Sequence, residues 1–414
     1  MLFTHFQSKI SLDRSIPDTS PRTASIHTLA IIYQNEIMNN LPYISLNQFI
    51  NFHKLIFFSL IITIACSCNV SDKQKPSTGD YQEFDDFFQS IENFSGNALV
   101  AIDGKSTYSK SFGYASRELL VKNTIDTKFR IGSISKPITA VAVMILVEKG
   151  LIDVNEHLST YISDIPVTWK DITIHQLLTH TSGLAFQPED MDTKHNLTIE
   201  KTFEMYQSLP LVQESGTAMN YSNMGYFVLS IIIEKVSNLP FDSFVQEEIF
   251  EKLGMVNSGG DYPNRILMQR AEGYEVNADG KVENADFDNM LIKRGAGNMY
   301  STVEDLYKLE KTFSSNLLLT EETLGKMMTP YTTDIDMGMD VKYGYGLDIV
   351  QNDSINMIFH TGGVLGFQSM FYVFPERGIV ITACANTTKL NRDWRTDFHK
   401  LVYNTISKTD YNKR

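Results

Sequence analysis

Residues 129–150 read FRIGSISKPITAVAVMILVEKG, and the fold prediction starts from this stretch because a serine and a lysine lie at the start of one long apolar run. Ser133 and Lys136 form the only Ser-x-x-Lys in the chain. The apolar spacing that ends at Gly150 predicts a helix over 134–149. Ser133 is then expected at the N-terminus of this helix, where unpaired N–H groups favour an oxyanion.

This pair has the chemistry of a nucleophile and its base. Residues three apart on a helix share a face. A serine hydroxyl is a weak nucleophile at neutral pH, whereas a lysine with a depressed pKa can accept its proton. The alternative is that Ser133 caps the helix and Lys136 is solvated, since about one or two chance matches are expected in a chain of this length.

Strand signals lie at the two ends of the chain and helix signals lie between them. Asp103-Gly104, a strong hairpin signal, joins strands expected over 97–102 and 105–114. The two ends can close only if they share one sheet. We therefore expect an α/β (α+β) fold: an antiparallel sheet flanked by helices, formed from both chain ends, with a mostly helical inserted lobe. The expected helices are 81–93, 134–149, 173–179, 223–236, 241–252, 302–313 and 391–407, and the later strands are 343–350, 356–360, 368–374 and 378–385.

A second motif, Tyr221-Ser222-Asn223, precedes the helix expected from residue 223. A phenol beside a cation can carry a proton, and the Asn223 amide can hold Lys136 or a substrate carbonyl. The alternative is a turn in which the tyrosine packs at the helix start and the asparagine is the cap.

A third motif, His360-Thr361-Gly362-Gly363, ends a predicted strand. Glycines on a strand edge let a substrate approach closely, and an amide N–H there can face a developing oxyanion. The alternative is a strand-to-turn transition with a surface histidine.

The order Ser-x-x-Lys, Tyr-x-Asn and His-Thr-Gly resembles the serine beta-lactamase and DD-peptidase superfamily, and most closely its class C beta-lactamase-like branch. The resemblance covers about residues 85–405 and implies the fold expected above. It implies that Ser133 is the acylated nucleophile, that Lys136 and Tyr221 share its proton, and that Asn223 positions Lys136 and the substrate amide.

The resemblance also implies the substrate-binding set Asn223, His360, Thr361, Gly362 and Gly363. The backbone N–H groups of Ser133 and Gly363 would form an oxyanion hole. His360 takes the place that lysine has in many beta-lactamases, which makes beta-lactam hydrolysis a weaker expectation.

Together the motifs predict a serine hydrolase that forms an acyl-enzyme on Ser133 and cleaves amide or ester bonds in a small-molecule or peptide substrate, as a DD-peptidase or esterase-like protein does. The alternatives are a class C-type beta-lactamase, or a penicillin-recognising cell-wall binding or sensor protein with little turnover. No cofactor and no metal are expected. His175 and His180 are five apart and would face away from each other on one helix.

The charge balance and the N-terminal region indicate where the protein acts. The chain has 36 basic and 49 acidic residues, a formal net charge of −13, which argues against a nucleic-acid partner. The eleven-residue apolar stretch 55–65 is too short to span a bilayer comfortably and is typical of a signal peptide. It ends at Cys66 in a sequence similar to the bacterial lipoprotein box, with Cys68 as a rival. A buried strand or helix is the alternative for 55–65.

The expected domain organisation has three parts. Residues 1–65 are a leader whose true start is Met38, residues 66–80 are a flexible polar tether, and residues 81–410 are the beta-lactamase-like serine hydrolase domain. The leader predicts an exported protein held at the membrane by a lipid anchor on Cys66, in the cell envelope on the periplasmic side or at the cell surface.

Overall fold

The computed structural model of the protein describes residues 81–188, 197–262, 264–333, 341–351 and 356–411. The predicted leader with Met38, the lipidation residue Cys66 and the tether 66–80 lie outside these residues. Within the described ranges, no helix has both the length and the apolar character needed to cross a membrane.

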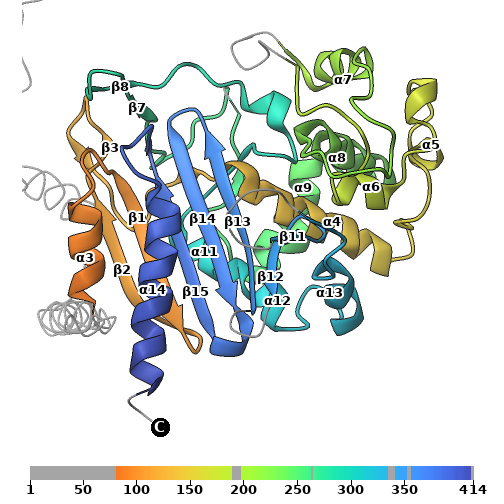
Figure 1. Ribbon diagram of the computed structural model, residues 1–414. Coiled ribbons are helices and arrows are strands. Elements are labelled where there is room, and N and C mark those ends of the chain that lie inside the picture. The colour runs from red at the N-terminus through yellow and green to blue at the C-terminus, as the bar shows by residue number, and fades with distance from the viewer. Residues whose placement is uncertain (1–80, 189–196, 263, 334–340, 352–355, 412–414) are drawn as a thin grey trace, which may run out of the picture. The chain divides into compact units, whose positions relative to one another are not determined.

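A sheet of eight strands joins the front and the back of the chain (Figure 1). Strand β1 (Gly96–Ile102) lies between β2 (Lys105–Phe112) and β15 (Ile379–Ala385) and pairs antiparallel with both. This confirms the prediction that the two ends share one antiparallel sheet. The order is β10-β11-β12-β13-β14-β15-β1-β2, in which β10 is Thr332–Thr333, β11 Lys342–Tyr343, β12 Asp348–Gln351, β13 Asn356–Val364 and β14 Phe367–Phe374.

The turn between β1 and β2 has the chemistry that the sequence predicted. Asp103 and Gly104 have φ angles of 49° and 74°. Two-residue hairpin turns of the favoured type need positive φ at both central positions, which aspartate tolerates and glycine adopts freely. The turn therefore fixes the register that pairs Ile102 with Lys105.

Helices cover both faces of the sheet, so β1 is apolar from Ala98 to Ile102. Ala98 and Val100 belong to a core that also contains aromatic side chains of α3 (Gln82–Gln89) and α14 (Trp394–Tyr411). Leu99 belongs to the larger core on the opposite face, together with the apolar side chains of the helical lobe. Figure 1 shows α3 and α14 on one face of the sheet and α11 (Val303–Leu309) behind it.

The inserted lobe is mostly helical, as predicted. It also contains short strands that the sequence did not predict, including the three-stranded sheet β5-β9-β6 and the hairpin β7–β8. The remaining helices are α4 Ser135–Glu148, α5 Leu158–Tyr161, α6 Ile174–Leu178, α7 Ile199–Gln207, α8 Asn223–Ser237, α9 Phe241–Val245, α10 Glu251–Leu253, α12 Lys311–Ser314 and α13 Glu321–Met327, and the minor strands are β3 Tyr114–Ser116, β4 Val121–Lys122, β5 Phe129–Arg130, β6 Gly259–Gly260, β7 Tyr274–Val276, β8 Val282–Asn284, β9 Met299–Ser301 and β16 Thr387–Thr388.

Some predicted elements were wrong in part. The strand predicted over 343–350 is interrupted, because β11 and β12 form a hairpin around Gly346, whose φ is 73°. A Cβ on Gly346 would lie 2.9 Å from the Lys136 carbonyl oxygen, so the turn presses directly on α4. The helix predicted over 241–252 contains a π-helical turn at Gln246–Phe250.

Candidate active site

The first motif folds as a 3-10 turn, Gly132–Ile134, that leads directly into α4. Ser133 therefore lies at the start of the helix, where it was expected. Ser135 stabilises this turn, because its Oγ donates to the Gly132 carbonyl at 2.8 Å and accepts the Met299 N–H at 3.2 Å. Pro137 falls in the first turn of α4, where its missing N–H removes no helical hydrogen bond.

The amine of Lys136 is the centre of the site. Its side chain is fully buried, and Nζ lies 3.1 Å from Ser133 Oγ, 2.7 Å from Asn223 Oδ1 and 2.9 Å from the carbonyl oxygen of Ala296. Asn223 Oδ1 and the Ala296 carbonyl can only accept, so Nζ must donate to both. A neutral amine has two N–H bonds and one lone pair. In the neutral form the lone pair is therefore left for the Ser133 hydroxyl.

The surroundings of Lys136 favour this neutral form. Burial holds the pKa of Lys136 well below its ordinary value of 10.5. The negative charge of Asp348 opposes this shift, and the positive charge of Lys293 adds to it. Lys136 can consequently accept a proton at a pH where an exposed lysine could not.

The second motif lies at the start of α8, and its residues have different roles there. Ser222 is the cap: its Oγ accepts the Gly225 N–H at 3.0 Å. The sequence alternative, in which asparagine caps the helix, is wrong. Because Ser222 satisfies the helix end, the Asn223 amide can bind elsewhere, and its Nδ2 donates to Gln187 Oε1 at 3.1 Å. This contact turns Oδ1 of Asn223 toward Lys136.

The Tyr221 ring lies near the Lys136 amine, which Ser133 also contacts. The centre of its ring is 4.6 Å from Lys136 Nζ, and its ring packs on the His180 ring with centres 4.3 Å apart. His180 is fixed in turn, because its Nδ1 accepts the Ser222 N–H at 3.0 Å. The structure thus brings the serine, the lysine, the tyrosine and the asparagine of two distant motifs together. The His180 ring packs against the ring of the tyrosine.

The third motif lies inside β13, which continues to Val364 instead of ending at His360. Strand β12 pairs with β13 only as far as Phe359, so the later part of the strand is paired with β14 alone. The first motif packs beside it: a Cβ on Gly132 would lie 2.6 Å from the Gly363 nitrogen. The two backbone segments that the resemblance assigns to an oxyanion hole are therefore in contact.

Replacing Gly362 by alanine is expected to destabilise the fold. A Cβ there would lie 1.9 Å from the Ile131 carbonyl oxygen and 2.3 Å from Ser369 Oγ. Relief of such an overlap requires movement of backbone, and we expect the free energy of unfolding in urea to fall by about 3 kcal/mol.

Gly363→Ala is the matched control, because nothing lies within 4 Å of its Cβ position. Its unfolding free energy should change by about 1 kcal/mol or less. Equal stability of the two variants would show that β13 does not rest on the Ile131 carbonyl.

His360 is buried and neutral. Its Nδ1 donates to the Thr361 carbonyl at 2.6 Å, which leaves Nε2 as an acceptor 3.4 Å from the Tyr343 hydroxyl. Burial lowers the pKa of His360 to about 3, and the charge of Lys136 acts in the same direction. The Nε2 of His180 lies 3.1 Å from the same hydroxyl, so Tyr343 stands between two histidines.

Sequence reasoning missed three contributors to this site. Ala296 carries no signal because any residue offers the carbonyl that Lys136 uses. Tyr343 was predicted only as the first residue of a strand, and Gln187 was not singled out. A search for polar residues near the three motifs could have suggested Gln187, but the contact itself depends on the fold.

Of the two histidines weighed as metal ligands in the sequence, His175 lies outside the site, whereas His180 packs against Tyr221. His175 Nδ1 lies 2.8 Å from the Tyr345 hydroxyl, whereas His180 faces Tyr343, so the two histidines serve different partners. In the part of the chain that the structure describes, no three His, Cys, Asp or Glu side chains are grouped as a metal site would need. Cys384 is a fully buried thiol, and burial raises its pKa.

Comparisons with known proteins show the family of this chain. The family model described as Beta-lactamase matches residues 84–402. The human protein named serine beta-lactamase-like protein LACTB, mitochondrial, is 24% identical over 395 residues, covering 69% of this chain and 72% of that protein.

Solved structures of two proteins superpose on this chain. The structure of a penicillin binding protein from Bacillus halodurans superposes with a TM-score of 0.68 at 26% identity, covering 78% of this chain and 99% of that one. D-amino acid amidase from Ochrobactrum anthropi SV3 superposes with a TM-score of 0.69 at 22% identity, covering 80% and 97%, which shows a shared fold. The chain belongs to the beta-lactamase family of serine hydrolases and penicillin-binding proteins.

Proposed function

We propose that this protein hydrolyses amide or ester bonds through an acyl-enzyme on Ser133. The observation that carries the proposal is the set of three contacts at Lys136 Nζ, two of which must be donated and one of which can receive the Ser133 proton. A buried amine held in this way is a general base next to its nucleophile.

The contacts at Lys136 support the following reaction. Ser133 Oγ attacks the substrate carbonyl carbon while its proton passes to the neutral Lys136 amine. The negative oxygen that forms is stabilised by the N–H groups of Ser133 and Gly363, at about 3 kcal/mol for each donor. The proton then passes through the Tyr221 hydroxyl to the leaving amine or alcohol as its bond breaks. Water attacks the acyl-enzyme with the same groups in reverse, which restores the Ser133 hydroxyl.

The substrate class is narrowed by His360. A lysine at this place of the motif would offer a positive charge to an anionic substrate, whereas His360 is neutral near pH 7 because its pKa is lowered to about 3. Because the histidine form of the motif is similar to that of some DD-peptidases and esterases, DD-peptidase or esterase-like activity on D-amino-acid-containing, cell-wall-like peptides is the activity we propose. The 26% identical structure is named a penicillin binding protein, which supports acylation of Ser133 by a penicillin-like compound. Beta-lactam hydrolysis is expected to be the weaker activity.

The test is a labelling and turnover experiment on the purified full-length chain. A fluorescent penicillin and a fluorophosphonate should label the wild type and fail to label Ser133→Ala. Nitrocefin, a p-nitrophenyl ester and a D-Ala-D-Ala peptide are then compared, and continued product release is expected for the ester or the peptide. A single stoichiometric burst with no further turnover would contradict hydrolysis and indicate a penicillin-recognising binder.

We also propose that the protein is exported and held in the cell envelope by lipid on Cys66, because the sequence before this residue is typical of a lipoprotein signal peptide. Cys66→Ser is expected to move the protein from the membrane fraction to the soluble fraction, whereas Cys68→Ser should leave it at the membrane. Mass spectrometry of the N-terminal peptide measures the lipid directly. Membrane association of Cys66→Ser, or release of Cys68→Ser, would contradict the assignment.

A further inference from the structure

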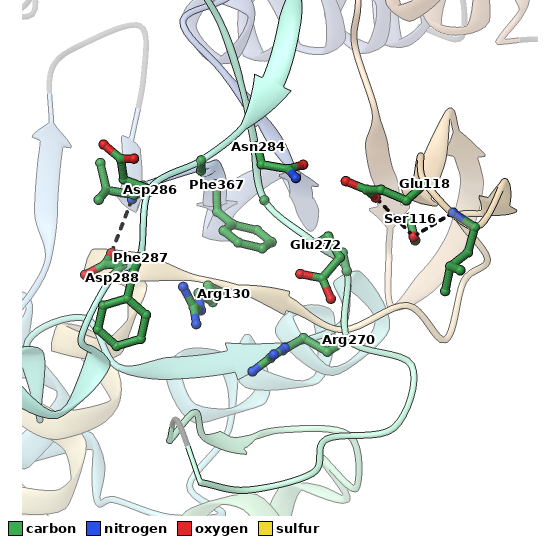
Figure 2. A pocket seen from close by; sticks show the side chains of 15 residues that line it. Ser116, Glu118, Arg130, Arg270, Glu272, Asn284, Asp286, Phe287, Asp288 and Phe367 are labelled. Carbon is green, nitrogen blue, oxygen red and sulfur yellow. Dashed lines mark hydrogen bonds between the residues drawn. The ribbon is translucent and has the colours of Figure 1, made fainter. Parts of the chain in front are cut away.

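A pocket of about 580 Å³ is lined by residues close in sequence to the first and third motifs and is not explained by the proposed mechanism (Figure 2). Its lining includes a residue just before the first motif and a residue just after the third motif. Arg130 lies three residues before Ser133, and Leu365 lies two residues after Gly363. The volume is in the range of pockets that hold small ligands. Residues of the pocket therefore lie within three residues of both catalytic segments along the chain, which makes the pocket a candidate for substrate binding.

One wall of the pocket is basic. Arg130 Nε and Arg270 Nη1 bind the two oxygens of Asp261 at 2.6 and 3.0 Å. Asp261 is almost completely buried and compensates only one of the two guanidinium charges. Figure 2 shows the ends of both arginine side chains turned toward the pocket, with Phe367 above Arg130. The wall thus presents an excess positive charge with N–H groups available to an anion.

The lining also contains carboxylates. The carboxylates of Glu272 and Asp286 make no ion pair or hydrogen bond with any residue that the structure describes. Glu118 accepts the Tyr274 hydroxyl at 2.5 Å, and this hydrogen bond lowers the pKa of Glu118, so it is ionised near neutral pH. The remaining carboxylate, Asp288, is already compensated by Lys293 at 2.6 Å.

The arginines and the carboxylates that line the pocket form no ion pairs with each other among the described residues. Arg270 and Glu272 are two residues apart, yet the only ion pair of Arg270 among the described residues is with Asp261. A purely anionic ligand would be repelled by the carboxylates, and a purely cationic ligand would be repelled by the arginines. A ligand that carries a carboxylate and an ammonium can satisfy both sets of charges, with the carboxylate on the guanidinium groups as a planar fork.

We propose that this pocket binds the zwitterionic end of an extended peptide substrate of Ser133. The assignment rests on the proposed function. A substrate carbonyl held between Ser133 and Gly363 has two directions in which to extend along β13, toward His360 or toward Leu365. Leu365 lines the pocket, so we expect an end directed toward it to enter the pocket and the preferred substrate to carry a free ammonium and a free carboxylate together on that end.

The experiment uses three p-nitrophenyl esters with the full-length protein. Each has a succinyl group linked to the Nε of lysine: one with free α-ammonium and α-carboxylate, one acetylated on the ammonium, and one amidated on the carboxylate. The zwitterionic ester is expected to have a kcat/KM about tenfold higher than either blocked ester. Glu272→Gln should reduce this value to that of the acetylated ester, and Arg270→Gln to that of the amidated ester. Glu283→Gln, an exposed carboxylate on β8 outside the pocket, is the control and should keep the preference.

A binding measurement separates this assignment from the proposed function. Nε-acetyl-lysine has the zwitterionic end and no ester, and calorimetry should show that it binds Ser133→Ala protein and that Glu272→Gln weakens this binding about tenfold. Equal hydrolysis of the three esters with no binding of Nε-acetyl-lysine overturns the pocket assignment and leaves the acyl-enzyme in place. Binding without hydrolysis of any ester supports the pocket and overturns the proposed function instead. Nε-acetyl-lysine that binds without raising KM for the zwitterionic ester identifies a separate ligand and overturns the extended-substrate assignment.

Discussion

Ser133→Ala is expected to lower the rate of acylation by about 10,000-fold or more. The Ser133 hydroxyl is the proposed nucleophile, and it lies 3.1 Å from the Lys136 amine that receives its proton. The fold should be unaffected, because Ser133 sits in a turn that is fixed by Ser135 and not by its own side chain. Stopped-flow kinetics with a p-nitrophenyl ester, and intact-mass detection of the acyl-enzyme, measure the loss.

The matched control for this experiment is Ser314→Ala, an exposed serine at the end of α12. It should be acylated at the wild-type rate. Retention of a stoichiometric covalent adduct in Ser133→Ala, with the mass of one acyl group, would place the nucleophile elsewhere.

Lys136→Met is expected to lower acylation by about 1,000-fold, within the range of a lost general base. Lys136→Arg should be as inactive, because a guanidinium keeps its proton and cannot receive the one on Ser133. The pair of variants separates charge from basicity. An arginine variant with near wild-type acylation would show that a positive charge, and not a proton acceptor, is what the serine needs.

The pH dependence of acylation follows from the same residue. Burial lowers the pKa of Lys136, so the wild-type rate should rise with pH as the amine becomes neutral and fall as it becomes protonated. Pre-steady-state acylation measured over a pH series should show this acid limb, and Lys136→Met should lack it. An identical acid limb in both proteins would assign the titration to another group.

Stability gives an independent view of the Lys136 pKa. The folded value lies below the unfolded value of 10.5, so the unfolded chain binds more protons in the interval between them. The free energy of unfolding of the wild type is therefore expected to decrease as the pH falls from 10.5 toward the folded pKa. Lys136→Met removes this contribution, which is at most about 1.4 kcal/mol per pH unit. Urea unfolding between pH 7 and 10 measures the difference in slope.

The elements that depend on local chemistry could be predicted from the sequence. The Asp103-Gly104 turn and the apolar run after Lys136 carry their own conformational preferences, and both formed as expected. That the two chain ends share one sheet could also be predicted, because the few strands at the front need the strands at the back to complete a sheet. The interruption around Gly346 could not, since it reflects the close approach of that turn to α4.

The sequence alone determined which residue types carry the chemistry: a serine, a lysine, a tyrosine and an asparagine in motifs with a fixed order. Tertiary structure decided how they are placed. Ser222 caps α8, and Asn223 Oδ1 accepts a hydrogen bond from Lys136. The carbonyl of Ala296, 160 residues away from Lys136, accepts the second one. A local pattern records periodicity and turn chemistry, whereas the pKa of a buried amine depends on desolvation and charges supplied by distant segments, which only the folded chain brings together.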